Sequence, residues 1–418
     1  MVPEDWKVKQ LADVCRKQIS YGIVQTGEHQ PNGIPCLRVV DLTKDEIQLE
    51  GMIRTTVEIH EAYRKTILEK DEIVMALRGE VGLVRLVDDK LVGANITRGL
   101  ARISAKPHLV SPEFLLWELR SPKFRADLMR RVGGSALQEI SLSELRKVQT
   151  LIPPLTEQKK IAQILSTWDK AITTTEQLLA NSQKKKKALM QQLLTGKKRF
   201  GHQLGSYEFK NTRYGKIPAD WSYPAIKEIS SNVSEKNAQG TDLPVLSCSK
   251  YDGFVDSLKY FKKKVYSEDT SGYRVIPRGC FGFPSNHIEE GSIGLQNLYD
   301  FGLVSPIYVV FKVNSRKVDA KFLYSLLKTE HYRQIFSAAT NASVDRRGSL
   351  RWKEFSAIHV PLPPLEEQQK IAAVLSMADS QIAVFQQKLD ALKQEKKALM
   401  QQLLTGKRRV TINEKEVA

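Results

Sequence analysis

Two long segments of the chain carry mostly apolar residues at alternating steps of four and three. The stripe in the first segment comprises Ile161, Leu165, Trp168, Ile172, Thr175, Leu179, Ser182, Lys186, Leu189 and Leu193. The stripe in the second comprises Ile371, Leu375, Ala378, Ile382, Phe385, Leu389, Leu392, Lys396, Leu399 and Leu403. This spacing is typical of a coiled-coil seam. Each segment follows Pro-Pro-Leu and ends at Thr-Gly-Lys, so we predict two helices of about 40 residues, closed by a C-terminal glycine.

A few polar residues interrupt both stripes. Thr175, Ser182 and the matched pair Lys186 and Lys396 occupy seam positions. Polar seam residues can fix the register of a coiled coil. They can equally mark the place where the coil opens to meet a partner, and the pattern favours neither reading.

The remaining sequence has the pattern of mixed α/β domains. Short β-rich runs at 72–77, 81–87 and 99–104 alternate with Gly, Asp and Lys turn signals. A helical run at 112–132 begins at Pro112 and is stopped by Gly133 and Gly134. A similar run lies at 321–339. We therefore expect strands followed by one helix in each mixed domain.

The second half of the chain repeats the first. The phrase ALMQQLLTGK occurs at 188–197 and again at 398–407, an offset of 210 residues. PPLTEQKKIAQILS (from Pro153) and PPLEEQQKIAAVLS (from Pro363) match at the same offset. By contrast, the strand-rich middles at 77–87 and 281–296 have almost nothing in common. We therefore expect each half to keep one shape while the sequence of its middle varies.

Connectivity then predicts the fold, of the α+β class. Helix one delivers the chain to the second domain, so helix two must run back if the two stripes pair. The prediction is two similar mixed α/β domains separated by two long helices that form an antiparallel coiled coil, with internal pseudo-twofold symmetry. The predicted boundaries are domain one at 1–152, helical region one at 153–200, a linker at 201–213, domain two at 214–362, helical region two at 363–409 and a tail at 410–418.

The charge of the chain indicates its partners. The formal net charge is +17, which attracts polyanions, nucleic acid first. An acidic protein or a membrane surface is the alternative. No apolar stretch of about 18 residues exists, and the start lacks the apolar region of a secretory signal. The four cysteines form no CxxC pair, which indicates reduced thiols in a cytoplasmic protein.

Motifs for catalysis are missing from the sequence. Neither Pro-Pro pair belongs to an (N/D/S)PP(Y/F) motif for a flipped base, and neither Gly-Lys pair belongs to a P-loop. The nuclease-like Glu395-Lys396-Lys397 lies inside a predicted coiled coil, and the histidines show no metal-ligand spacing. We expect no active site and no metal site in this chain.

A basic pseudo-twofold protein matches duplex DNA, whose own local dyads allow two inverted domains to read two half-sites. Because the two middles differ, the half-sites should differ, with an unread spacer between them. Candidate contacts in domain one are Arg78, Asn95, Thr97, Arg98, Arg102 and Gln138. Candidates in domain two are Lys250, Tyr251, Ser285, Asn286, His287, Arg346, Arg347 and Arg351, and the run Lys262, Lys263 and Lys264 beside Tyr260 suits phosphate. For each one, a solvated charge or a turn residue is the alternative.

One position stands out because it recurs in both halves at the 210 offset. The segments 137–142 and 347–352 each follow the main helix of their domain. The repeated ALMQQLLTGK is mostly uncharged, and two identical surfaces related by a twofold suit two copies of one partner. For the lysine run at 183–190, we favour a solvated face or a partner contact over a DNA contact. Candidate coil and docking residues are Ile161, Leu165, Trp168, Ile172, Leu179, Leu189, Leu193, Ile371, Leu375, Ile382, Phe385, Leu389, Leu399 and Leu403.

The chain resembles the specificity (S) subunits of type I restriction–modification systems over essentially its full length. The most specific elements are PLPPLEEQ (361–368), IPPLTEQ (152–158) and the twin ALMQQLLTGK phrases. The resemblance implies two target recognition domains that each read one half of a bipartite site in double-stranded DNA. It also implies helical regions that set the spacer and bind two modification subunits, in the cytoplasm of a prokaryote.

The same resemblance places the chemistry on other chains. S-adenosylmethionine and adenine-N6 methylation are expected on the modification subunits, and ATP with Mg²⁺ is expected on a restriction subunit. Two alternatives remain: a stand-alone DNA-binding regulator, and a coiled-coil scaffold whose globular ends bind proteins.

Overall fold

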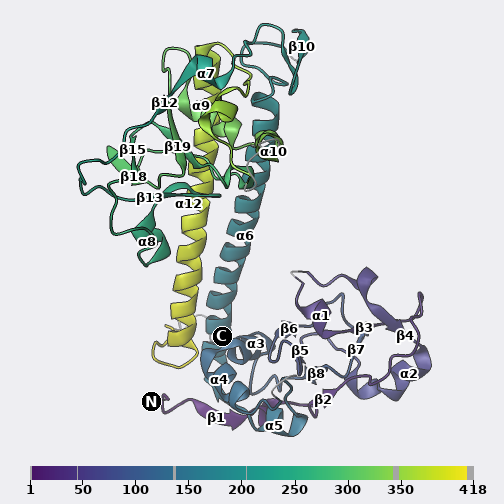
Figure 1. The fold of residues 1–418 in the computed structure, drawn as a ribbon. Helices are drawn as coiled ribbons and strands as arrows, with labels where there is room; N and C mark the ends of the chain where they lie inside the picture. Colours follow the sequence, from purple (N-terminus) through teal and green to yellow (C-terminus); the bar gives the residue numbers. More distant parts are fainter. Residues whose placement is uncertain (1, 45, 135–137, 204, 342–347, 412–418) are drawn as a thin grey trace. The chain divides into compact units, whose positions relative to one another are not determined.

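The computed structural model describes residues 2–44, 46–134, 138–203, 205–341 and 348–411. The chain divides into two compact units. Unit 1 comprises Met1–Glu176 and Gln387–Ala418, and unit 2 comprises Gln177–Gln386. Each unit holds one mixed domain and a part of each long helix (Figure 1).

The two long helices have the predicted length and seam. Helix α6 is Leu155–Leu193 and helix α12 is Leu365–Leu403, each of 39 residues. Every seam position is buried or half-buried, including the polar Thr175, whose side chain is 3% exposed. Beyond the helix ends, Gly196 and Gly406 have φ of +68° and +71°, in the left-handed region that favours glycine. The predicted glycine stops are confirmed.

In unit 1 the parts of α6 and α12 run antiparallel. The Lys396 ammonium pairs with the Asp169 carboxylate, and Lys393 pairs with Glu176 at 2.7 Å. Advancing along α6 from 169 to 176 therefore means retreating along α12 from 396 to 393. The antiparallel pairing agrees with the predicted coiled coil.

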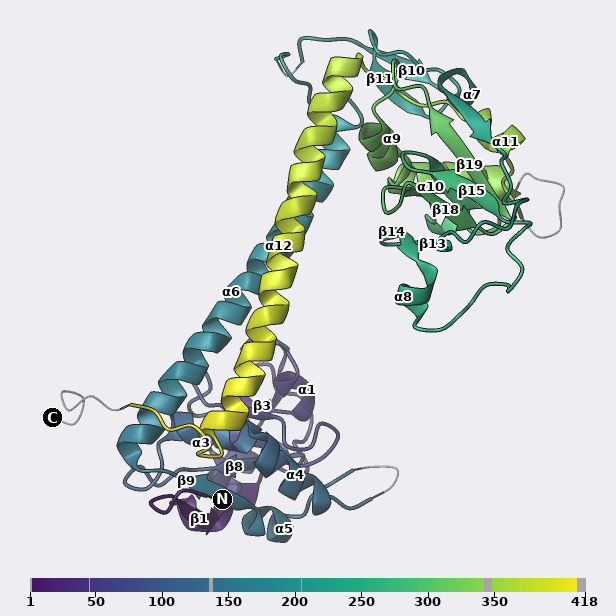
Figure 2. The same cartoon turned by 90° about the vertical axis from the view of Figure 1, so that its left-hand side faces the viewer.

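Unit 2 repeats this arrangement with the helices exchanged. Lys186 of α6 pairs with Asp379 of α12 at 2.5 Å, the same two residue types at the 210 offset. Past the end of α6, Arg199 pairs with Glu367 in the first turn of α12 at 2.8 Å. The two helices lie side by side in this unit (Figure 2).

The mixed domain of unit 1 contains three small sheets. The strand orders are β2-β8-β5-β6, β4-β3-β7 and β1-β9. Its strands are β1 (Lys7–Gln10), β2 (Ser20–Tyr21), β3 (Ile34–Leu37), β4 (Ile53–Thr55), β5 (Ile73–Ala76), β6 (Val84–Leu86), β7 (Asn95–Ile96), β8 (Leu100–Ile103) and β9 (Gln149–Ile152). Its helices are α1 (Val39–Leu42), α2 (Val57–Ala62), α3 (Pro112–Arg120), α4 (Pro122–Arg130) and α5 (Leu142–Lys147). The predicted strand runs correspond to β5, β6 and β8.

The mixed domain of unit 2 has a related layout. Its four-stranded sheet has the order β12-β19-β16-β17, beside the pairs β13-β14, β15-β18 and β10-β11. Its strands are β10 (Phe209–Thr212), β11 (Gly215–Pro218), β12 (Ser230–Val233), β13 (Leu246–Ser249), β14 (Gly253–Asp256), β15 (Arg274–Pro277), β16 (Phe281–Pro284), β17 (Gly294–Leu295), β18 (Phe301–Val304) and β19 (Tyr308–Val313). Its helices are α7 (Ile226–Ile229), α8 (Ser257–Phe261), α9 (Ala320–Leu327), α10 (Glu330–Asn341) and α11 (Trp352–Ser356).

The prediction of a single helix over 112–132 is wrong. The run is divided into α3 and α4 because Ser121 adopts an extended backbone and its hydroxyl caps the second helix by accepting from the Phe124 N–H at 3.1 Å. Pro122 is then the first residue of α4, where its missing N–H costs nothing. The matching run in unit 2 is also divided, into α9 and α10, and there the Thr329 hydroxyl accepts from the Tyr332 N–H at 3.3 Å.

A buried glutamine fixes each long helix to its own mixed domain. The Gln158 amide accepts from the Ser111 N–H at 2.9 Å and donates to the Leu109 and Pro153 carbonyls at 3.0 and 2.8 Å. Its counterpart Gln368 accepts from Asp319 and donates to Lys317 and Pro363 at 2.9, 3.0 and 2.8 Å. Both amides are fully buried, so the domain and the start of the helix form one folded unit.

Candidate nucleic-acid interface and docking helices

The two mixed domains share one backbone junction, where the chain leaves a central strand. In unit 1 the carbonyl of Leu77, just past β5, accepts from the Ile140 N–H at 2.9 Å. In unit 2 the carbonyl of Ser285, just past β16, accepts from the Leu350 N–H at 2.7 Å. Ile140 and Leu350 are 210 residues apart. We call residues 77–80 with 138–140 the unit 1 junction, and residues 285–291 with 350–351 the unit 2 junction.

Three of the predicted DNA contacts lie together at the unit 1 junction. Arg78 pairs with Glu139 at 3.4 Å, and its side chain is 37% exposed. Gln138, beside Glu139, is exposed. The Leu77 N–H donates to the Gly99 carbonyl at 2.8 Å, which brings the exposed Arg98 next to Arg78 in the fold. Guanidinium and amide groups such as these read the edges of guanine and adenine.

The other three candidates of unit 1 point inward. Asn95 is fully buried in β7, and its side-chain Oδ1 accepts a hydrogen bond from the Thr66 hydroxyl at 2.8 Å. Arg102 is 4% exposed and lies 3.8 Å from the buried carboxylate of Glu72. Thr97 is half-buried and donates its hydroxyl to the Leu37 carbonyl at 3.0 Å. The side chains of Asn95 and Arg102 are packed inside the domain, so the prediction that they contact DNA is not supported by their positions.

The unit 2 junction carries different side chains on the same backbone. Asn286 is half-buried, and among the described residues its Oδ1 has no hydrogen-bond partner. His287 is exposed and lies 3.2 Å from the Glu290 carboxylate. Ser285 is buried, and Arg351 follows Leu350 at the surface. The predicted contacts Arg346 and Arg347 lie outside the described residues.

A second loop of unit 2 lies next to this junction. Lys328 donates its ammonium to the carbonyls of Lys250 and Gly291 at 2.6 and 2.9 Å. It thereby fixes the turn between β13 and β14 beside the junction. Tyr251 in this turn is 80% exposed, and the Lys250 ammonium lies 5.6 Å from the centre of its ring. An exposed aromatic ring next to a cation suits stacking on a base.

The predicted lysine run forms a separate basic surface. Lys262, Lys263 and Lys264 follow α8 and are all exposed. Lys264 pairs with Glu268 at 2.5 Å. Tyr260, 49% exposed, packs edge-on against Phe261. Lys262 and Lys263 therefore extend into solvent as phosphate contacts would require.

Sequence reasoning missed a pair of ionic clusters at the helix ends. In unit 2 the Arg199 guanidinium donates two hydrogen bonds to Glu367, at 3.0 and 2.8 Å, and a third to Asp220 at 2.7 Å. The hydrogen bond from Arg199 to Asp220 holds the pKa of the Asp220 carboxyl below its usual value. The cluster joins the end of α6 to the first turn of α12.

Unit 1 contains the matching cluster. Arg409 donates two hydrogen bonds of 2.8 Å to Glu157 and bonds of 2.9 and 2.6 Å to Asp5. We call the two clusters the helix-end clamps. The signal was present in the sequence, because Arg199 and Arg409, like Glu157 and Glu367, are 210 residues apart.

The two repeated ALMQQLLTGK phrases contain both buried and exposed residues. Leu193 and Leu194, within the first ALMQQLLTGK phrase, are 2% exposed and pack into the core of unit 2. Leu403 and Leu404 do the same in unit 1. The repeated leucines therefore stabilise the units. A partner can instead reach the exposed polar residues of the two phrases, such as Gln191 and Gln401.

Titratable groups elsewhere serve the fold. All four cysteines are unbonded, as predicted, and burial raises the pKa of Cys15 to about 12. Burial also raises the pKa of Glu118 to about 8, although its carboxylate accepts from the Leu151 N–H at 2.8 Å. Within the described ranges, one group with metal-ligating atoms occurs, His287 with Glu289 and Glu290. No helix among the described residues is long and apolar enough to cross a membrane.

Comparison with known proteins identifies the family. The family model "Type I restriction modification DNA specificity domain" matches the chain twice, over residues 3–182 and 225–394. The chain is 26% identical to the putative type I restriction enzyme MjaX specificity subunit of Methanocaldococcus jannaschii, covering 98% of this chain and 95% of the relative. It is 25% identical to the MjaVIII specificity subunit of the same organism, over 98% and 94% of the two chains.

A solved structure supports the fold. The S subunit of the type I restriction–modification system of M. genitalium superimposes with a TM-score of 0.58 at 15% identity, covering 99% of this chain and 97% of that one. The two matched segments each contain one junction and most of one long helix. The chain therefore belongs to the type I restriction–modification DNA specificity family, and it is a DNA sequence-recognition subunit of that kind.

Proposed function

We propose that each mixed domain reads one half of a bipartite, asymmetric DNA site, and that the paired helices set the unread spacer. The chain would act without an active site of its own, in the cytoplasm of a prokaryote. Two modification subunits would dock on the helices and supply S-adenosylmethionine-dependent adenine methylation. A restriction subunit with ATP and Mg²⁺ would complete the complex.

One observation carries this proposal: the same backbone junction presents different side chains in the two units. The bonds Ile140 to Leu77 and Leu350 to Ser285 are equivalent. Around them stand Arg78, Arg98 and Gln138 in unit 1 but Asn286, His287 and Arg351 in unit 2. A scaffold that keeps its backbone and exchanges its hydrogen-bonding groups is what the reading of two unlike sequences requires.

The charge of the chain favours DNA over a protein ligand. The net charge is +17, and exposed lysines such as Lys250, Lys262 and Lys263 lie in the unit that carries the second junction. Phosphate neutralisation releases counterions, so affinity should fall steeply with added salt. A flat salt response would favour the scaffold alternative instead.

Matched variants test which domain reads which half. The complex with its modification subunit selects binding sites from a random DNA library as wild type, as R78A and as N286A. We expect R78A to relax one half of the site and N286A to relax the other, each by about 1–3 kcal/mol per base pair. K70A, which removes an exposed lysine paired with Asp89, is the control and should leave both halves intact.

Three outcomes would redirect the proposal. If both variants relax the same half, the assignment of one domain to each half is wrong. If the chain binds its site alone and never retains a modification subunit, a stand-alone regulator is the better description. If no sequence is enriched by the wild-type complex, the recognition role itself fails.

A further inference from the structure

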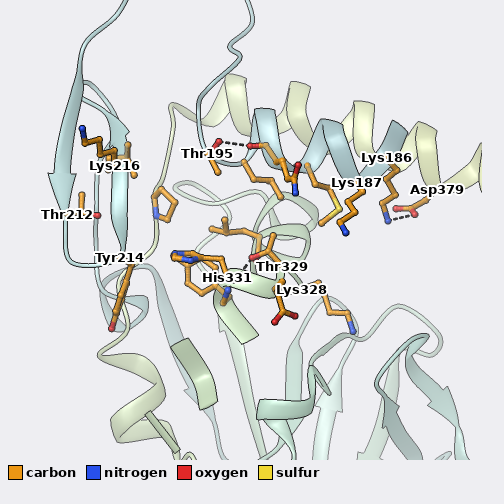
Figure 3. A pocket seen from close by; sticks show the side chains of 18 of the residues that line it. Lys186, Lys187, Thr195, Thr212, Tyr214, Lys216, Lys328, Thr329, His331 and Asp379 are labelled. Carbon is orange, nitrogen blue, oxygen red and sulfur yellow. Dashed lines mark hydrogen bonds and ion pairs between the residues drawn. The ribbon is translucent and has the colours of Figure 1, made fainter. Parts of the chain in front are cut away.

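A cavity of about 630 Å³ lies within unit 2, where α6 faces the mixed domain (Figure 3). Its lining comes from one side of α6, the hairpin β10–β11, the end of α9 with the start of α10, and α12 around Ile382. The apolar part of the lining includes Met190, Leu194, Ile217, Leu326 and Pro361. Small-molecule sites in proteins are typically cavities of roughly 300–1,000 Å³ with an apolar lining and a few placed polar groups. The cavity of unit 2 has the size and the lining of such a site.

One part of the cavity is built from aromatic rings. Tyr214 comes from the turn of the hairpin, Tyr223 from the segment between β11 and α7, and His331 from the first turn of α10. The rings of Tyr214 and Tyr223 lie edge-on with their centres 6.5 Å apart. The Tyr223 hydroxyl is shielded from solvent beside Thr212, and among the described residues no group completes a hydrogen bond with it. Rings with a buried polar tip favour a flat aromatic occupant that also carries polar atoms.

Another part of the cavity is positively charged. The lining contains four lysines and two acidic residues, and both acids are already paired, Asp379 at 2.5 Å and Glu330 at 2.6 Å from their cations. Lys187 of α6 and Lys328 just past α9 have no carboxylate partner among the described residues. In Figure 3, Tyr214 lies on one side of the cavity and these two lysines lie on the other, with His331 between them. The distribution of charge therefore favours an anion at the lysine side.

Lys328 also connects the cavity to two loops of the candidate DNA interface. Its ammonium donates to the carbonyls of Lys250, in the turn that carries Tyr251, and of Gly291, in the unit 2 junction. An ammonium has three N–H donors, so one remains for a ligand. Burial lowers the pKa of Lys328, and an anion beside it would stabilise the charged form that both loop contacts use.

We propose that the cavity of unit 2 binds a small aromatic anion of about mononucleotide size. Its ring lies against Tyr214 and His331, and its anionic group lies between Lys187 and Lys328. Occupancy fixes the Lys328 ammonium on both loops and so strengthens DNA binding by unit 2. This effect on DNA rests on the proposed function, whereas the ligand site itself does not.

Unit 1 offers an internal comparison at the matching place on its helices. A cavity of about 300 Å³ there has Lys397 and Met400 in the positions of Lys187 and Met190, 210 residues apart. Its lining of Pro122, Asp169, Ile172, Lys393, Lys396, Lys397 and Met400 contains no aromatic ring. The same helix surface without the aromatic side should not bind the ligand, which makes a change at Lys397 the matched control for a change at Lys187.

Isothermal titration calorimetry on the purified complex of the full chain with its modification subunit tests the site. The probes are GMP and indole-3-acetate, which distinguish a nucleotide from an aryl carboxylate as the source of the aromatic anion. Guanosine and inorganic phosphate each carry only half of the recognised chemistry. We expect at least one probe to bind, and each half-ligand to bind at least about 10-fold more weakly than GMP if the nucleotide is preferred. The modification subunit alone, titrated in parallel, shows any binding that belongs to the partner.

Variants of exposed residues then locate the bound probe. K187A removes a cation and H331A removes a ring, and each should weaken binding about 10-fold or more. K397A, an equally exposed lysine of unit 1, should leave the dissociation constant unchanged. Fluorescence anisotropy with the DNA site of the complex, at one fixed salt concentration, measures the effect on DNA. A saturating probe should tighten DNA binding by about 5-fold in wild type and K397A but not in K187A.

Several results would overturn the inference. Binding of neither probe by wild type, binding that the modification subunit alone reproduces, or equal effects of K187A and K397A would each refute the ligand site. A bound probe that leaves the DNA affinity of wild type unchanged would refute the connection through Lys328. Failure of the wild-type complex to bind any DNA site would count against the proposed function and not against the ligand site.

Discussion

The helix-end clamp of unit 2 gives a prediction that can be worked through from the structure. The change is R199M, which keeps an unbranched apolar stem but removes the guanidinium group and its charge. The Arg199 side chain is 2% exposed and Glu367 is 9% exposed. Removing the cation leaves a carboxylate with little access to water and no counter-charge. Breaking such a buried pair from one side costs about 3–5 kcal/mol.

The pseudo-equivalent R409M provides an internal comparison. The Arg409 side chain is 46% exposed, so water can enter the space it leaves and solvate Glu157, although the Glu157 side chain is itself only 1% exposed. Glu157 also keeps the hydrogen bond from the Trp6 indole N–H at 3.1 Å, whereas the Trp221 indole N–H has no hydrogen-bond partner among the described residues. We therefore expect R409M to cost about 1–2 kcal/mol, clearly less than R199M.

Hydrogen exchange with mass spectrometry is the assay, because it reports each unit separately in a chain whose two units need not unfold together. The free energy of opening is followed in peptides over 365–372 and 155–162. The double variant R199M/E367M should recover much of the loss, because it replaces both charges with apolar groups. Equal effects of R199M and R409M, or a double variant as unstable as R199M, would refute the reasoning.

Three further predictions concern stability and the spacer. Burial raises the pKa of Glu118 in the folded chain to about 8, against an ordinary value of 4.5. The wild-type chain should therefore lose stability as the pH rises from about 4.5 to 8. In urea unfolding, E118Q should lose less stability over this range, by up to about 1.4 kcal/mol per pH unit. Parallel pH profiles for the two proteins would contradict this. G406A should destabilise unit 1 by about 1–3 kcal/mol in thermal unfolding, because φ at Gly406 is +71° and an added Cβ would lie 2.4 Å from Pro3 Cγ. Unchanged stability would argue against this packing of Gly406 on Pro3. Four residues inserted after Glu176 add about 6 Å of helix. The spacer in the DNA site should then change by one or two base pairs, while both half-sites stay the same. Altered half-sites would refute the role of the helices in setting the spacer.

The long helices could be predicted because their signal is local and repeated. A seam recurring over 39 residues leaves few alternatives, and every seam residue is at least half-buried. The break at Ser121 and Pro122 was also readable, since a capping serine before proline is a helix start. It was missed because the apolar pattern continues through it.

The interface was harder to predict because burial depends on distant pairing. The segment around Asn95 has the composition of an exposed loop. It is buried because β7 pairs in parallel with β3, Asn95 opposite Cys36, across about 60 residues of sequence. Arg78 and Gln138, in contrast, follow a predictable strand and a predictable glycine turn, and the structure brings them together through Glu139.

The helix-end clamps were also hard to predict, because they join residues that are far apart in the sequence. Arg409 and Asp5 are 404 residues apart, and no local pattern links them. Their counterparts at Arg199 and Asp220 are 21 apart, which is close enough to be suspected. Comparison of the two halves of the repeat was the signal that could have found both.

The most direct test of bipartite recognition is the DNA motif that the complex modifies. The chain is expressed with its modification subunit in cells that lack other adenine methyltransferases, and modified adenines are mapped by single-molecule sequencing. We predict one motif with two unlike specified parts separated by a spacer of fixed length and any sequence. A single uninterrupted motif, or two identical halves, would contradict the claim that the two mixed domains read different sequences.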